Sequence, residues 1–105
     1  MKSEQVIEHI KDSILKFVPA RCIYLFGSYA YGTPTEQSDF DIYLVTPDEV
    51  TDFSQLYAKI IGDLGDKNIF FIDLLLTSES VFESRKDKFI LEKTIIKKGK
   101  IIYEH

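Results

Sequence analysis

Three aspartates in this sequence have the spacing and neighbours of a divalent-cation site. Asp39 and Asp41 are separated by one residue, and Asp73 interrupts the apolar run Ile69–Leu76. Because residues i and i+2 of a strand share one face, Asp39 and Asp41 would lie about 6 to 7 Å apart at Cα. Carboxylates so close repel each other without a counter-ion, and Mg²⁺ prefers a few carboxylates completed by water and substrate phosphates. The alternative is a polar strand face on which both aspartates are solvated.

Asp73 strengthens the metal interpretation because of its surroundings. The run Ile69–Leu76 is typical of a central strand. A carboxylate there loses hydration or is protonated, so it requires a metal ion, a basic partner or an edge position. If this strand pairs with Phe40–Val45 and presents Asp73 on the same face as Asp41, three aspartates converge.

A Gly27-Ser28 pair follows a short apolar segment and precedes a stretch that can begin a short helix. The free N–H groups and positive dipole end of a helix N-terminus bind phosphate, and glycine lets the backbone approach closely. The Ser28 hydroxyl adds a hydrogen-bond donor. The alternative is a serine that caps the helix after a glycine turn.

A phosphate-binding turn beside three carboxylates suits nucleotidyl transfer by two metal ions about 3.5 to 4 Å apart. Positioning and charge neutralisation dominate such chemistry, so a catalytic histidine or cysteine is not required. His9 lies in the first helix and His105 ends the chain, which argues against a Ser-His-Asp hydrolase and against a zinc site.

The elements that must position these residues alternate between helical and strand periods. Ser3 is a candidate N-cap of the first helix, and Gly65 is expected to end the second. Ser80 and Glu83 have capping-box spacing and are expected to open one last helix that bears Phe89, Ile90 and Ile95. The expected order is helix 7–17, strand 22–26, strand 40–45, helix 53–64, strand 69–76, the last helix and strand 100–103. This order predicts an α/β or α+β sandwich with helices packed on one sheet.

Composition sets limits on the class of protein. The chain has 105 residues, 45% hydrophobic and 29% charged, which predicts one domain over residues 1–105. No segment is apolar enough to cross a bilayer, the first residues are too polar for a signal peptide, and the single Cys22 is expected in the core, so we expect a cytoplasmic protein. The net charge of -4 disfavours direct nucleic-acid binding, and the lysine clusters near residues 85–88 and 97–100 are interpreted as a solvated helix face.

The segment 27–32 (GSYAYG), the segment 38–41 (SDFD) and the later Asp73 together resemble the signature of the polymerase-β-type nucleotidyltransferase superfamily, and within it the minimal nucleotidyltransferases. The resemblance covers essentially the whole chain. It implies a mixed sheet of about four strands with flanking helices, ATP as substrate and two Mg²⁺ ions. The catalytic and metal-binding residues it implies are Asp39, Asp41 and Asp73, and the nucleotide-binding residues are Gly27, Ser28 and Ser38.

Minimal members of this superfamily commonly occur as antitoxins paired with a HEPN-domain toxin, and some transfer AMP to a tyrosine of that partner. The resemblance therefore implies an antitoxin that adenylylates a HEPN-type RNase, within a homo- or hetero-oligomer. One alternative is an antitoxin that acts by binding alone, through apolar sheet edges at 69–76 or 100–103, although we expect these edges to be buried within the domain. Another is a small-molecule transferase of the aminoglycoside-modifying type.

One residue departs from the pattern of many relatives. They carry a basic residue where this sequence has Tyr31, so phosphate neutralisation must come from elsewhere. Tyr31 either stacks on the nucleotide base or packs against the domain, and we expect packing.

Overall fold

The computed structural model describes residues 1–105 and contains one four-stranded sheet in the order β3-β2-β1-β4. Its elements, in chain order, are α1 (Ser3–Phe17), β1 (Cys22–Phe26), α2 (Ser28–Tyr31), β2 (Phe40–Thr46), α3 (Phe53–Asp66), β3 (Ile72–Ser78), α4 (Glu79–Arg85), α5 (Ile90–Lys98) and β4 (Lys100–Glu104). β2 and β3 are parallel, whereas β1 is antiparallel to β2 and β4. The expected mixed sheet with flanking helices is confirmed.

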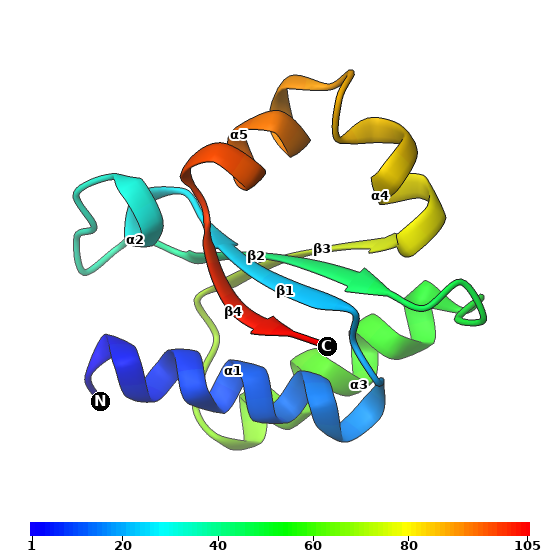
Figure 1. Ribbon diagram of the computed structural model, residues 1–105. Helices are drawn as coiled ribbons and strands as arrows, with labels where there is room; N and C mark the ends of the chain where they lie inside the picture. The colour runs from blue at the N-terminus through cyan, green and yellow to red at the C-terminus, as the bar shows by residue number, and fades with distance from the viewer.

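The two faces of the sheet carry two hydrophobic cores. Figure 1 shows α1 and α3 on one face and α4 and α5 on the other. The larger core, under α1 and α3, includes Ile10, Ile60 and the β2 residue Ile42. The smaller core joins Tyr43 and Ile95 with Cys22, which is buried as expected. Because side chains alternate along a strand, the face that carries Tyr43 also carries Asp41, and the carboxylate therefore points away from the larger core.

Two helix ends differ from the sequence expectations. The N-cap of α1 is Lys2, not Ser3, and the side chain of Gln5 accepts a hydrogen bond from the Lys2 backbone N–H at 3.0 Å. α3 continues through Gly65 to Asp66. The left-handed residue that turns the chain after α3 is Asn68, with φ 63°, because asparagine tolerates this conformation better than most residues.

The strand after α3 also differs from the sequence expectation of a strand over residues 69–76. Residues 69–71 connect α3 to the sheet, and the strand occupies Ile72–Ser78. It forms an edge of the sheet, so the expectation of a central strand was wrong. Apolar composition misled here because the residues before the strand, Phe70 and Phe71, are exposed on the surface.

The single last helix expected after residue 80 is two helices. The N-cap of α4 is Ser78, two residues earlier than the Ser80 capping box indicated. Asp48, in the loop after β2, accepts a hydrogen bond from the Ser80 N–H at 2.9 Å and so satisfies a free donor in the first turn. The chain then breaks at residues 86–89 before α5 begins. No helix is long and apolar enough to cross a membrane.

A buried carboxylate holds α4 and α5 to the sheet. Glu92 of α5 accepts hydrogen bonds from the Tyr43 hydroxyl at 2.7 Å and from Arg85 Nε at 2.8 Å. Burial opposes the ionisation of Glu92, but these hydrogen bonds hold its pKa below the usual value. Since the Tyr43 side chain lies on the face of β2 that carries Asp41, this network fixes the helix layer beside the carboxylates.

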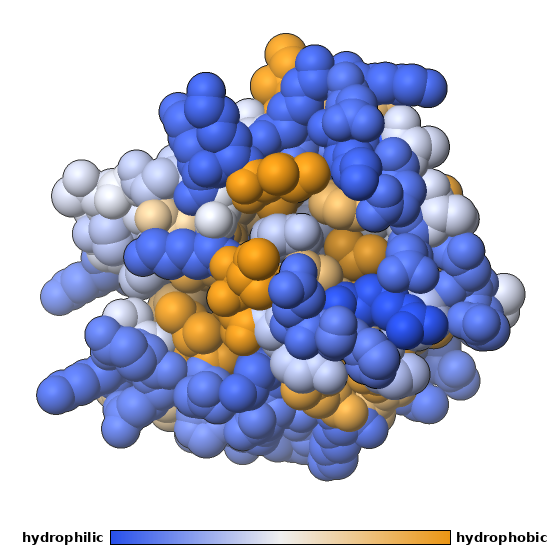
Figure 2. All heavy atoms as spheres, viewed as in Figure 1, coloured by the Kyte–Doolittle hydropathy of each residue, from blue (hydrophilic) through white to orange (hydrophobic).

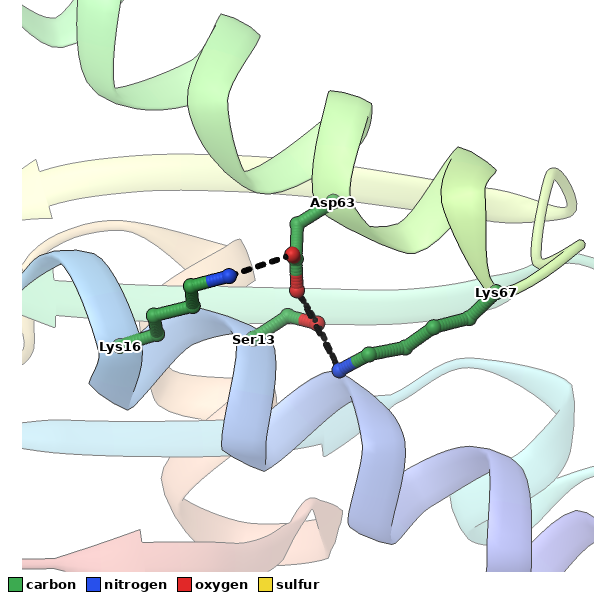
Figure 3. Close-up of polar contacts among 4 residues, drawn as sticks. All are labelled: Ser13, Lys16, Asp63 and Lys67. Carbon is green, nitrogen blue, oxygen red and sulfur yellow. Dashed lines mark hydrogen bonds and ion pairs between the residues drawn. The ribbon is translucent and has the colours of Figure 1, made fainter.

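On the opposite face, a second polar cluster joins α1 to α3 (Figure 3). Asp63 accepts hydrogen bonds from the buried Ser13 hydroxyl at 2.6 Å and from Lys16 Nζ at 3.0 Å. Lys67 Nζ donates to Ser13 Oγ at 2.8 Å and lies 3.2 Å from Asp63 Oδ2. The Ser13 hydrogen bond first, and then Lys16, lower the pKa of Asp63, so the folded state favours its charged form.

The first prediction concerns this cluster. A carboxyl group whose pKa is lower in the folded state than in the unfolded state stabilises the fold at pH values above the ordinary carboxyl pKa. This contribution is lost as the pH falls toward the lowered pKa. Asp63→Asn should therefore reduce stability near neutral pH, and its difference from the wild type should shrink in acid. Urea unfolding over a pH series measures this. Asp66→Asn, on the same helix, is the control because Asp66 forms no ion pair; an equal effect of both substitutions would contradict the assignment.

Candidate active site

The structure places Asp41 and Asp73 side by side. They are register partners across the parallel β2–β3 pair, as are Phe40 with Ile72 and Ile42 with Leu74. Neighbouring strands lie about 4.8 Å apart, so the two carboxylates leave the sheet next to each other. The predicted convergence of these two residues is thus present in the backbone register.

Asp39 completes the acidic group. It lies directly before β2, is exposed, and is close enough to contribute to the charge around Asp41. Asp73 is also exposed, because β3 is an edge strand. A charged Asp73 was expected to need a metal ion, a basic partner or an edge position, and the structure provides the edge position. Asp73 alone therefore gives no reason to expect a metal.

Electrostatic strain instead appears at Asp41. Burial, then the charge of Asp73 and then that of Asp39, raise the pKa of Asp41. None of the three aspartates forms an ion pair with a lysine or arginine. The acidic group therefore has repulsion that a bound cation would relieve.

These residues fit Mg²⁺ as a partial ligand set. Carboxylate oxygens are the hard ligands that Mg²⁺ selects. No group of three acidic, histidine or cysteine side chains is placed so that it could hold a metal ion. The predicted convergence of three aspartates is therefore not present, and the strand register brings together only Asp41 and Asp73. This arrangement matches a metal ion that takes its remaining ligands from water and from phosphate oxygens.

Gly27 lies directly against Asp41. Its φ is 72°, in the left-handed region, and a Cβ at this position would overlap Asp41 Oδ2. Phe26, the residue before it, is the register partner of Asp41. Gly27 is thus required both by its backbone conformation and by the close approach of the carboxylate.

The residues after Gly27 form the expected short helix α2, with Ser28 first. The N–H groups of Ala30 and Tyr31 donate to the Gly27 carbonyl at 3.0 and 3.1 Å. The first N–H groups of a helix have no partner within it. The turn therefore presents backbone donors at the end of β1, adjoining the carboxylates.

Two neighbouring side chains behave differently from expectation. Tyr31 is 45% exposed, so the prediction that it packs was wrong; Tyr29 packs instead, with its ring stacked 3.9 Å from that of Phe40. Ser38 Oγ accepts a hydrogen bond from the Thr35 N–H at 2.9 Å, which closes the loop before β2. A nucleotide contact of Ser38 stays a prediction.

Sequence reasoning missed the residues that support the site from α4 and α5. Glu92 and Arg85 fix these helices over Tyr43, and no motif marked them. The sequence offered only a weak signal: Glu92 precedes the apolar Ile95 by three residues, and residues three apart share a helix face.

Comparison with known proteins identifies a family and two similar adenylyltransferases. Residues 8–105 match the family described as "Polymerase beta, Nucleotidyltransferase". A putative protein adenylyltransferase of Methanocaldococcus jannaschii is 28% identical over 105 residues, which cover 98% of this chain and 100% of that protein. The protein adenylyltransferase MntA of Shewanella oneidensis is 32% identical over 76 residues, covering 70% of this chain and 52% of MntA. The matched region thus spans about half the length of MntA.

Solved structures share the fold. A chain of a toxin-antitoxin crystal structure with AMP-PNP has a TM-score of 0.68 and 23% identity, covering 94% of this chain and 73% of that one. A chain from the complex of a tri-AMPylated Shewanella oneidensis HEPN toxin with an MNT antitoxin has a TM-score of 0.62 and 20% identity, covering 99% of this chain and 74% of that one.

The second prediction tests the contact between Gly27 and Asp41. Gly27→Ala must displace the carboxylate and hold alanine at positive φ, which costs roughly 1–2 kcal/mol. Because a displacement of about 1 Å can reduce a rate about a hundredfold, nucleotidyl transfer should fall by about that factor. Gly62→Ala is the control, since no atom lies within 4 Å of its added Cβ, and it should raise stability by roughly 0.5–1 kcal/mol. Full activity of Gly27→Ala would contradict the proposed geometry.

Proposed function

The chain belongs to the polymerase beta nucleotidyltransferase family, and we propose that it uses Mg²⁺ to transfer AMP from ATP to a protein partner. The observation that carries this proposal is the register pairing of Asp41 with Asp73 beside the Gly27 turn. Two relatives named as protein adenylyltransferases support a protein acceptor. The similar chain in a complex with an AMPylated HEPN toxin supports a HEPN-type toxin as that acceptor and an antitoxin role.

Each part of the site has a distinct task in this proposal. The N–H groups of the Gly27–Ser28 turn and the Ser28 hydroxyl bind the triphosphate. Asp39, Asp41 and Asp73 would supply carboxylate ligands to two Mg²⁺ ions. Bound there, the ions would neutralise the phosphate charge and polarise the reacting phosphorus centre.

The reaction joins an acceptor hydroxyl to the α-phosphate. The acceptor oxygen loses its proton to solvent water and forms the new P–O bond, while the bond between the α-phosphorus and the α–β bridging oxygen breaks. Pyrophosphate leaves with that electron pair. The protein's contribution is to hold the reacting groups in line and to balance their charge.

The shape of the surface favours a macromolecular acceptor over a small molecule. The molecule has four surface pockets, and none is lined by Gly27, Ser28 or the three aspartates. One of them lies instead between the end of α1 and the start of α3. A small acceptor such as an aminoglycoside needs a concave site beside the carboxylates, whereas a partner protein brings its own surface.

A second candidate is an antitoxin that acts by binding alone. It is favoured by apolar side chains at both sheet edges: Phe70 and Phe71 before β3 are 67% and 62% exposed, and Ile101 of β4 is 56% exposed. Figure 2 shows apolar surface on the face of the molecule that carries β4. The expectation that these edges are buried was wrong for Phe70, Phe71 and Ile101, and exposed apolar edges are suited to partner contact.

The third prediction separates the two candidates. Incubation with labelled ATP, Mg²⁺ and a HEPN-type partner protein should label that protein. Asp41→Asn and Asp73→Asn should each reduce labelling at least about a hundredfold, because each removes a charge that positions the metal. The complex should still form in size-exclusion chromatography.

Glu36→Gln is the matched control, since it also converts an acid to an amide, in the exposed loop before β2. It should label normally. Absence of label with the wild type, or equal labelling by Asp41→Asn, would refute the transferase proposal. Full neutralisation of the toxin by Asp41→Asn would favour the binding antitoxin.

A further inference from the structure

The proposed site lacks positive charge of its own. Residues 22–58, which contain the Gly27 turn and both aspartates of the β2 segment, include no lysine or arginine. A triphosphate carries several negative charges, and desolvating them beside three carboxylates requires cations. If the proposed function holds, a basic group from another part of the chain should reach the triphosphate together with Mg²⁺.

Nearly half of the basic side chains, all of which lie outside this segment, are already paired. Six form ion pairs with acidic residues: Lys11, Lys16, Arg21, Lys67, Arg85 and Lys86. Among the unpaired lysines, Lys97, Lys98 and Lys100 flank Gly99 at the junction of α5 and β4.

This junction is fixed at the end of the sheet that carries the site. Lys100 pairs with Leu25 of β1, two residues before Gly27. A Cβ on Gly99 would lie 2.5 Å from the Ile95 carbonyl oxygen and 3.1 Å from the Leu25 carbonyl oxygen. The last turn of α5 is therefore packed on the backbone of β1, and Figure 1 shows the chain passing from α5 into β4 beside β1.

Helical geometry distinguishes between the lysines of this turn. Ile95 is fully buried and belongs to the core cluster against which Phe26, the register partner of Asp41, packs. At about 100° per residue, Lys98 lies about 60° from Ile95 around the helix, whereas Lys97 lies about 160° away. Lys98 therefore lies nearer the sheet side of α5 than Lys97 does, and both side chains are exposed. Lys100 pairs with Leu25, which faces the larger core, so it lies on the other face of the sheet.

We infer that Lys98 is a triphosphate-binding residue, which supplies the positive charge that the Gly27 segment lacks. Its ammonium group balances charge on the phosphates beyond the α-phosphate. This charge increases when the α–β bridging bond breaks and pyrophosphate departs with the electron pair, so Lys98 also favours the leaving group. A lysine at the end of a helix also complements the helix dipole, but Lys97 meets that need equally well.

The fourth prediction compares these neighbours in the full chain. Titration calorimetry with ATP and Mg²⁺ should show about tenfold weaker binding for Lys98→Gln, in line with the loss of one charge-assisted contact. Lys97→Gln should bind ATP within about twofold of the wild type. AMP binding should change by less than about twofold in both variants, because AMP lacks the phosphates that Lys98 contacts. Lys98→Arg should restore most of the ATP affinity, and thermal unfolding should show equal stability of the two glutamine variants.

The outcomes separate this inference from the function on which it rests. Equal ATP binding by the Lys98→Gln and Lys97→Gln variants, with strong binding by the wild type, would overturn the role of Lys98 and leave the transferase proposal intact. Equal losses of ATP and AMP affinity in Lys98→Gln would overturn it too. No ATP binding by the wild type would overturn both.

Discussion

The carboxylates of Asp41 and Asp73 leave the sheet at the same level of two neighbouring parallel strands. A shift of one residue in this register would turn Asp73 to the opposite face, toward α3. The register of β2 with its other neighbour fixes the Gly27 turn, because β1 pairs with β2 so that Phe26 lies opposite Asp41. The backbone hydrogen bonds of β2 to β3 and to β1 thus position both the proposed metal ligands and the proposed phosphate turn.

The stability of the domain comes from elsewhere. The larger core and the Ser13–Asp63 cluster hold α1 and α3 to one face, and Glu92 holds α4 and α5 to the other. At the carboxylate end, burial and then repulsion from Asp73 and Asp39 raise the pKa of Asp41. Since a ligand that binds only the folded state stabilises it, bound metal and nucleotide would offset this repulsion. The rest of the fold therefore offsets the repulsion between these carboxylates when no cation is bound.

Much of this arrangement could be predicted from the sequence. Short-range patterns located α2, the two central strands and the candidate aspartates, because residue spacing determines which side chains share a face. The sequence misled where tertiary context decides. The apolar run around Asp73 resembles a central strand, yet Phe70 and Phe71 lie on the surface and β3 forms an edge. Spacing could not show that α5 ends beside β1, since that contact joins residues far apart in the chain, and so the position of Lys98 required the structure.

The central claim is that the Gly27 turn and the Asp41–Asp73 pair together bind a metal-bound triphosphate. The most direct measurement is a crystal structure of the protein with AMP-PNP and Mn²⁺, in which anomalous scattering locates the metal. The account predicts Mn²⁺ coordinated by Asp41, with Asp39 or Asp73 as a further ligand, and phosphate oxygens within hydrogen-bond distance of the Ser28 N–H. Mn²⁺ bound away from these aspartates, or a triphosphate that does not touch the Gly27–Ser28 turn, would contradict it.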